Sequence, residues 1–249
     1  MTDFFNFFRY NEKTMKKGLL TGTVLIAATI AAVAPSAGSS ASGDVTVLSQ
    51  RNGITRWAHV LRPVAARSAP SASARTITVV SDTTPEGTSN LVLALESKGS
   101  WVRVRLAVLP NGTTGWVPRT ALGPYRGVWT HLVVSRARMT ATLLRRGKAI
   151  FRAPVGVGRS YLPTPRGEFY VRMKLAGFSD PMYGPIAFGT SGRAPNLTGW
   201  PGGGYIGIHG TDKPQLLPGA VSHGCIRMKN PDILRLARLM PVGTPVTVL

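Results

Sequence analysis

The chain has 249 residues, including 28 Gly and 19 Pro, and only 16% of its residues are charged. This length suits one large domain or two modest ones, and the Gly and Pro content favours short strands with frequent turns. Basic residues outnumber acidic ones by 30 to 10, which gives a formal net charge of +20. Such an excess favours a polyanionic neighbourhood, either a nucleic acid or an anionic cell wall or membrane surface.

The placement of the basic residues and the small number of acidic ones argue against nucleic-acid-binding proteins and glycosidases, respectively. Lys and Arg are spread along the chain, and no zinc-finger, helix-turn-helix or aromatic RNA-binding pattern occurs, so we expect no nucleic-acid partner. With ten Asp and Glu in all, no close pair of carboxylates resembles a glycosidase site. Anionic cell-wall polymers are the partner class that fits the charge.

The N-terminal segment predicts export. A basic start at Met15–Lys17 precedes an apolar run over 18–33 and then a stretch of small residues, which together are typical of a secretory signal peptide over residues 1–41. Cleavage after Ala37 or after Ala41 fits equally well, and Met15 is an alternative start. An uncleaved membrane anchor is the other interpretation, although the run is short for a span of about 20 residues. We therefore predict a secreted protein of the extracellular cell wall.

Residues 44–125 carry short strand candidates separated by turns. From Trp101 to Leu106, apolar residues alternate with polar or aromatic ones, as in a half-buried strand. Asn111–Gly112 is a strong hairpin signal and is followed by the Gly-Trp-Val strand of 115–117. This pattern resembles a bacterial SH3-like domain, which implies a small N-terminal barrel. Its predicted strands are Thr76–Val80, Leu91–Leu95, Trp101–Val108 and Trp116–Val117.

Two linking segments delimit this module. Residues 66–75 are rich in Ala and Ser, and we expect them to form the first loop of the barrel. Residues 123–127 contain Gly and Pro and are expected to join it to a second module over 128–249.

The second module is predicted to be mainly β with one short helix. Asn230 is the expected N-cap, Pro231 the first helical residue and Asp232 a favourable charge in the first turn, and the helix should run through Met240 to stop at Pro241. Turns are expected at 145–148 and 156–160. The predicted strands are His131–Ser135, Met139–Leu144, Ala149–Val155, Glu168–Met173, Tyr205–His209 and Thr244–Leu249.

The second module also holds a combination of residues suited to nucleophilic catalysis. Cys225 is the only cysteine, and an unpaired thiol in an exported protein points to a use for it. A cysteine attacks as thiolate and needs a base, which His209 at a strand end could supply. Gly210 and Gly224 allow a substrate to approach closely, and the amides of Gly224 and Cys225 could face a developing oxyanion.

Other interpretations of these residues stay open at this point. His209 could be a hydrogen-bonded strand-end histidine, His223 a brace for a turn, Arg227 a solvated charge and Cys225 a small core residue. Zinc is the chemical alternative, because His209, His223 and Cys225 are all ligand types, but no acidic partner or fourth ligand is apparent. A papain-like peptidase would place Cys before His, the reverse of the order here.

The segment from Ile208–Gly210 to Ser222–Met228 resembles the catalytic motif of the L,D-transpeptidase (YkuD-type) family. The similarity runs from about 128 to 249 and includes Thr164–Phe169, Tyr183–Phe188 and Val242–Val246. The resemblance implies a YkuD-type β-sandwich behind the SH3-like barrel. It also implies an enzyme of cell-wall biogenesis that needs no cofactor or metal.

The resemblance further implies a reaction and a set of roles. Cys225 attacks the carbonyl of the third stem residue of peptidoglycan, a diaminopimelate, and the terminal D-alanine leaves. The side-chain amine of a second stem then resolves the acyl-enzyme and forms a 3→3 cross-link. Carbapenems are expected to acylate Cys225. The implied roles are general base for His209, orientation of that base for the Gly210 carbonyl, oxyanion or support for His223 and Gly224, and substrate contact for Arg227, Tyr183 (on a flap) and Ser222.

Two alternative functions remain. If water resolves the acyl-enzyme, the protein is an L,D-carboxypeptidase. If the site is idle, the SH3-like module makes it a non-catalytic wall-binding protein.

Overall fold

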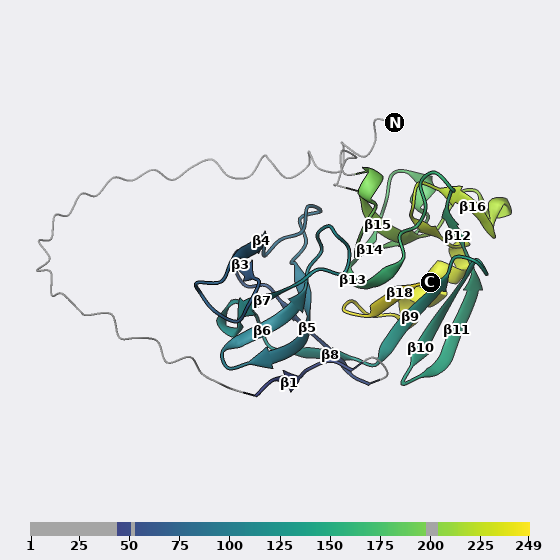
Figure 1. Cartoon of the computed structure of the whole chain (residues 1–249). Coiled ribbons are helices and arrows are strands. Elements are labelled where there is room, and N and C mark those ends of the chain that lie inside the picture. The colour runs from purple at the N-terminus through teal and green to yellow at the C-terminus, as the bar shows by residue number, and fades with distance from the viewer. Residues whose placement is uncertain (1–43, 51–52, 198–203) are drawn as a thin grey trace, which may run out of the picture. The chain divides into compact units, whose positions relative to one another are not determined.

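The computed structural model describes residues 44–50, 53–197 and 204–249, which are mainly β with one α-helix (Figure 1). The predicted signal peptide at 1–41 lies outside the described residues. Within the described ranges, no helix has the length and apolar character that a membrane span requires.

The first sheet has eight strands in the order β4-β3-β7-β6-β5-β2-β8, with β1 paired to β5. The alternation predicted from Trp101 to Leu106 is confirmed, because Val102, Val104 and Leu106 are buried while the residues between them are half-exposed. The hairpin at Asn111–Gly112 is also confirmed, since it joins the antiparallel pair β6–β7. The strands are β1 Thr46–Val47, β2 Thr55–His59, β3 Val64–Arg67, β4 Thr76–Val80, β5 Leu91–Lys98, β6 Trp101–Arg105, β7 Thr114–Pro118 and β8 Arg126–Val128.

The first sheet differs from the sequence prediction at its edges. The predicted loop 66–75 begins later, because Ala66 and Arg67 belong to β3 and pair with β4. β8 pairs with β2, so part of the predicted joint at 123–127 is a strand. Both strands are short and weakly patterned, and they form because a distant strand offers backbone partners, which local sequence does not reveal.

The second sheet has ten strands in the order β11-β10-β9-β18-β13-β14-β15-β17-β12-β16. Most neighbours are antiparallel, while β9–β18, β15–β17 and β12–β16 are parallel pairs. The strands are β9 Thr130–Ser135, β10 Thr140–Arg145, β11 Lys148–Pro154, β12 Gly156–Gly158, β13 Gly167–Ala176, β14 Ile186–Arg193, β15 Tyr205–His209, β16 Gly219–Ser222, β17 Ile226–Arg227 and β18 Pro245–Val248.

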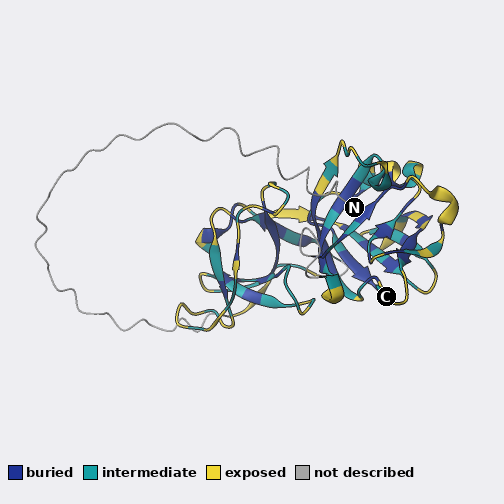
Figure 2. Cartoon of the chain, turned by 90° about the horizontal axis from the view of Figure 1, so that it is seen from above, coloured by how far each residue is buried: buried dark blue, intermediate teal, exposed yellow. Residues whose placement is uncertain are grey.

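This sheet folds over one apolar core in a β-sandwich-like manner. The core joins Leu132 and Leu143 of the β9–β11 half to Phe188 and Ile208 of the half that carries β14 and β15. Helix α1, Asn230–Leu239, adds Ile233 and Leu236 to the same core. Figure 2 shows buried residues along the strands and exposed ones in the connecting loops.

Two predictions for the second module are wrong in detail. Gly156–Gly158 was expected to be a turn but is strand β12, which pairs in parallel with β16. The helix has Lys229, not Asn230, at its N-cap, and it ends at Leu239. The Asn230 side chain is used elsewhere, as described below.

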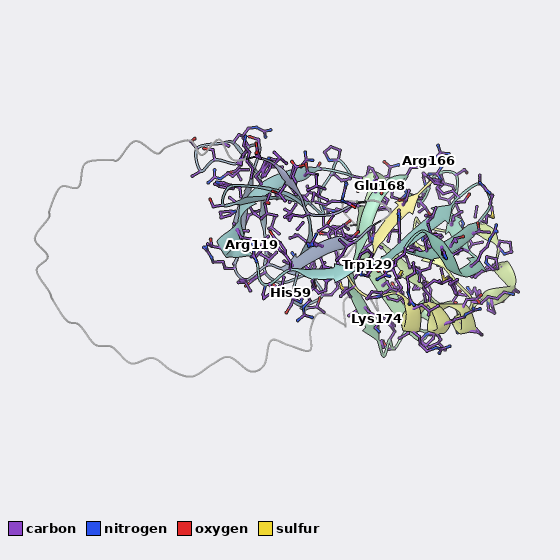
Figure 3. All side chains as sticks on the ribbon, turned by 90° about the horizontal axis from the view of Figure 1, so that it is seen from below. His59, Arg119, Trp129, Arg166, Glu168 and Lys174 are labelled. Carbon is purple, nitrogen blue, oxygen red and sulfur yellow. The ribbon has the colours of Figure 1, made fainter. Side chains whose placement is uncertain are left out.

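The two sheets pack directly against each other along β13, whose course Glu168 and Lys174 mark in Figure 3. Tyr170 of this strand joins a small apolar cluster with Trp57 and Leu91 of the first sheet. Its hydroxyl donates to the Leu91 carbonyl at 3.2 Å. On β15, the Tyr205 hydroxyl likewise donates to the Ala107 carbonyl at 3.1 Å. The first module is thus anchored to β13 and to β15, the strand that carries His209.

Candidate active site

Strands β15 and β17 bring together the two residues that the motif separates. They pair in parallel, with Ile208 opposite Ile226 and His209 opposite Arg227. Side chains alternate between the faces of a strand, so His209 and Arg227 share one face while the two isoleucines point into the core. Cys225, two positions before Arg227, lies on the same side as His209.

The Cys225 sulfur lies against the backbone of β15. The Gly207 N–H donates to Sγ at 3.4 Å. This contact favours the thiolate, because an N–H group stabilises negative charge on sulfur. The Cys225 residue as a whole is partly exposed.

A tight turn holds the nucleophile. The Ser222 hydroxyl donates to the Cys225 carbonyl at 2.6 Å and accepts from the Gly224 N–H at 3.1 Å. Ser222 is only 1% exposed, and its hydroxyl is occupied inside the turn, which favours a bracing role over the substrate contact that the motif implied. The Gly224 amide is likewise used within the turn and does not face outward for an oxyanion.

His209 has a defined tautomer. Its Nδ1 lies 2.7 Å from the Gly210 carbonyl oxygen, and because a carbonyl only accepts, Nδ1 carries the proton and Nε2 is left as the basic nitrogen. Burial lowers the pKa of His209 to about 4, with Arg227 adding to that effect and the Gly210 carbonyl opposing it. The imidazole is therefore neutral, and able to accept a proton, across the physiological pH range.

The imidazole and the thiol converge on Gly207. A Cβ at Gly207 would lie 3.7 Å from Cδ2 of His209 and 3.8 Å from Sγ of Cys225. Cδ2 adjoins Nε2 in the ring, so the edge of the imidazole that carries the basic nitrogen faces the same space beside Gly207 as the thiol. The absence of a side chain at Gly207 leaves room between the two groups.

The thiol is protonated at rest. Burial raises the pKa of Cys225, and this outweighs the opposing effects of the Gly207 N–H and the Arg227 guanidinium. A neutral thiol beside a neutral imidazole is therefore the ground state, and proton transfer must accompany attack. Arg227 favours the thiolate and disfavours the imidazolium, which is consistent with its place opposite His209.

Tyr183 covers the outer side of the imidazole. It ends a short 3₁₀ helix, Pro181–Tyr183, that begins with the Asp180 carboxylate accepting from the Met182 N–H at 2.8 Å. The Tyr183 and His209 rings have centroids 5.2 Å apart. Burial, followed by the nearby Cys225 and Asp180, raises the pKa of Tyr183, so its hydroxyl stays protonated.

Asn230 holds the backbone that follows His209 in place through a side-chain hydrogen bond. Its Oδ1 accepts from the Thr211 N–H at 2.9 Å. The same oxygen occupies the place where a Cβ at Gly184 or at Gly210 would lie. One carboxamide thus fixes the segment that carries the Gly210 carbonyl, the end of the Tyr183 turn and the start of α1.

His223, another predicted site residue, does not share the buried environment of His209. His223 is exposed, unlike the buried His209, so the two histidines are in contrasting environments. Among the described residues, no group of three His, Cys, Asp or Glu is placed so that it could hold a metal ion.

Gly207 was not among the predicted site residues, and Asn230 was predicted only as a helix N-cap. Gly207 could have been found, because it lies two positions before His209 and so shares its face of the strand. The contact of Asn230 with Thr211 joins segments that are far apart in sequence, and no local pattern predicts it.

This geometry can be compared with known proteins. Residues 130–248 match the family model YkuD, the L,D-transpeptidase catalytic domain. The match supports a YkuD-type catalytic domain in this part of the chain, and its bounds include Cys225, His209 and Asn230.

Two relatives and one solved structure match parts of this chain. The protein named YkuD in Bacillus subtilis (strain 168), provisionally assigned as an L,D-transpeptidase, is 35% identical over 118 residues, which cover 47% of this chain and 65% of that one. A YkuD protein of Bacillus licheniformis is 35% identical over 133 residues, covering 50% and 66%. The chain thus spans slightly less than two thirds of these relatives. A solved L,D-transpeptidase from Mycobacterium tuberculosis H37Rv gives a TM-score of 0.41 at 17% identity, covering 64% of this chain and 90% of that one.

Proposed function

We propose that this protein is a peptidoglycan L,D-transpeptidase that works through a Cys225 acyl-enzyme. The observation that carries the proposal is the arrangement around Gly207, where the thiol of Cys225 and the neutral imidazole of His209 both border the same space. The match of residues 130–248 to the L,D-transpeptidase catalytic domain supports the choice of reaction.

In the first half-reaction, Sγ of Cys225 attacks the carbonyl of the third stem residue while Nε2 of His209 takes the thiol proton. The C–S bond forms, the C–N bond to the terminal D-alanine breaks, and the imidazolium returns the proton to the leaving amine. The Gly210 carbonyl holds the imidazole in its tautomer, as the third group does in other triads. Arg227 opposes a long-lived imidazolium, which favours rapid return of the proton.

In the second half-reaction, the side-chain amine of another stem attacks the thioester. The new amide forms the 3→3 cross-link, the C–S bond breaks, and the amine proton passes through His209 back to sulfur. If water attacks instead, the product is a tripeptide and the protein is an L,D-carboxypeptidase.

The remaining parts of the proposal concern the setting of the enzyme. The strongly basic chain suits retention by anionic wall polymers, with the signal peptide directing it to the extracellular cell wall. We assign residues 44–125 to an SH3-like module, supported by the antiparallel sheet of short strands and by the β6–β7 hairpin. Carbapenems are expected to form an adduct at Cys225.

Product analysis by mass spectrometry tests the function. The mature protein and the Cys225→Ala variant are incubated with tetrapeptide stems. Release of D-alanine with a cross-linked dimer, absent in the variant, supports a transpeptidase, and tripeptide alone indicates a carboxypeptidase. Equal products from both proteins, or none from either, would contradict the catalytic assignment and favour wall binding.

A further inference from the structure

A cavity of about 380 Å³ lies where the first sheet meets β13 and β15. The first module contributes a wall that is apolar at residues such as Val80 and Leu106 and polar at Thr78, Ser81 and Asn90, and the second contributes Arg172 and Tyr205. A volume of this size accommodates an amino-acid-sized group. The cavity is separate from the Cys225 turn and has no part in the mechanism above.

Arg172 is an unusual residue for such a wall. It is only 3% exposed, and in the described part of the chain its Nε and Nη1 atoms have no hydrogen-bond partner. Nη2 reaches only the Asn90 Oδ1, at a long 3.4 Å. The guanidinium lies 4.6 Å from the centroid of the Tyr205 ring, which offsets part of its charge without using its donors.

A second cation lies beside the same ring. The Arg193 guanidinium is 5.0 Å from the Tyr205 centroid. Two guanidinium groups therefore lie around the ring of one tyrosine at this end of β15. A buried guanidinium with unused donors is costly, and a planar carboxylate is the group that satisfies it best, through paired hydrogen bonds. Because Arg172 forms part of the cavity wall, the cavity is the side from which that carboxylate can approach.

The cavity is linked to the nucleophile by a single strand. Tyr205, Gly207 and His209 alternate with the buried Ile206 and Ile208, so all three lie on one face of β15. Two residues of a strand span about 7 Å, which puts the Tyr205 side of the cavity roughly two extended peptide residues away from the sulfur that Gly207 contacts.

We propose that the Arg172 cavity is a carboxylate-recognition subsite for the stem peptide, built jointly by both modules. It binds a free carboxylate close to the carbonyl that Cys225 attacks, with the hydroxyls of the first module around it. This inference rests on the proposed function for the identity of the ligand. It gives the first module a part in substrate recognition through its contact with β13 and β15.

Binding without turnover tests the subsite. In the Cys225→Ala background, isothermal titration calorimetry compares a tetrapeptide stem with free carboxylates and the same stem with its carboxylates amidated. We expect the free acid to bind about 10- to 100-fold more tightly, and adding Arg172→Met to remove that preference. Arg172→Lys should retain part of it, whereas Arg152→Met, which removes an exposed charge on β11, should leave it intact.

The outcomes separate the subsite from the reaction. A preference for the acid that survives Arg172→Met overturns the subsite, as does failure to bind either stem. Thermal unfolding and iodoacetamide labelling of Cys225 in the single Arg172→Met variant establish that its fold and nucleophile are intact. If wild-type protein binds the acid through Arg172 yet releases no D-alanine, the proposed function falls while the subsite stands.

Discussion

His209 and Arg172 are equally buried, each with 3% of its surface exposed, yet the chain treats their polar atoms differently. His209 has a backbone carbonyl at 2.7 Å that fixes its tautomer, whereas Arg172 has two nitrogens without a partner in the described residues. The protein has therefore preorganised His209, whereas the partner of Arg172 comes from a bound ligand in our proposal. A buried base is ready before substrate arrives, and a buried unpaired cation indicates where substrate binds.

The largest expected effect comes from removing the preorganised base. His209→Ala should slow acylation of Cys225 by the tetrapeptide stem about 10²- to 10⁴-fold, because His209 is the general base that accepts the thiol proton. His223→Ala, at an exposed position in the same motif, is the matched control and should have a much smaller effect. Stopped-flow or quenched-flow acylation rates decide the point, and comparable losses in both variants would contradict the assignment.

Burial of His209 also predicts a pH dependence of stability. Its pKa falls from 6.5 in the unfolded chain to about 4 in the fold, so the unfolded state binds the proton first as the pH falls. The contribution of the neutral imidazole is complete above pH 6.5 and is lost as the pH falls to 4, at a cost of about 3 kcal/mol.

Urea unfolding at pH 7 and pH 4.5 measures this effect. The free energy of unfolding should fall less over that interval in His209→Gln, which cannot titrate, than in the wild type. Equal losses in the two proteins would mean that the imidazole is not held neutral by burial.

Asn230 should act through His209 rather than on substrate. Asn230→Ala frees the Thr211 amide and the segment bearing the Gly210 carbonyl, and we expect acylation to fall by about 10- to 100-fold, as for small misplacements of catalytic groups. Asn230→Asp keeps an acceptor oxygen and should restore much of the rate.

The pH profile distinguishes positioning from a merely structural role. The added carboxylate in Asn230→Asp should raise the pKa of His209 and move the acid limb of kcat/KM to higher pH. A rate restored without that movement would mean that Asn230 does not act on His209.

The smallest expected effect is at Arg172. Replacing a buried, unpaired cation by an apolar side chain of similar length removes a desolvation penalty, so Arg172→Met should not lower the free energy of unfolding and should raise it by about 1 kcal/mol. Loss of the contact with the Tyr205 ring offsets part of this gain. Chemical denaturation checks it, and a clear loss of stability would mean that Arg172 has a structural role and no need of a ligand.

The sequence predicted the elements that have a clear local pattern. Strands with a clear pattern, such as Thr76–Val80 and Tyr205–His209, coincide with those of the structure, as does the hairpin at 111–112. The motif also pointed to Cys225 and His209 as neighbours, which the β15–β17 pairing brings together.

The features that escaped prediction all depend on distant partners. β12 is a strand only because β16 lies beside it, and the Asn230 side chain turns from its own helix to Thr211. The Arg172 cavity needs both modules in contact. An arginine in a strand of mixed pattern carries no sign of whether its guanidinium will find a carboxylate.

The acyl-enzyme itself is the most direct measurement. Intact-protein mass spectrometry, with tetrapeptide stem supplied and acceptor stem omitted, should show a mass increase equal to the stem less its D-alanine, mapped to Cys225 by peptide digestion. Cys225→Ala should show none, and His209→Ala should accumulate it far more slowly. D-alanine release without an adduct at Cys225, or an adduct on another residue, would contradict the account.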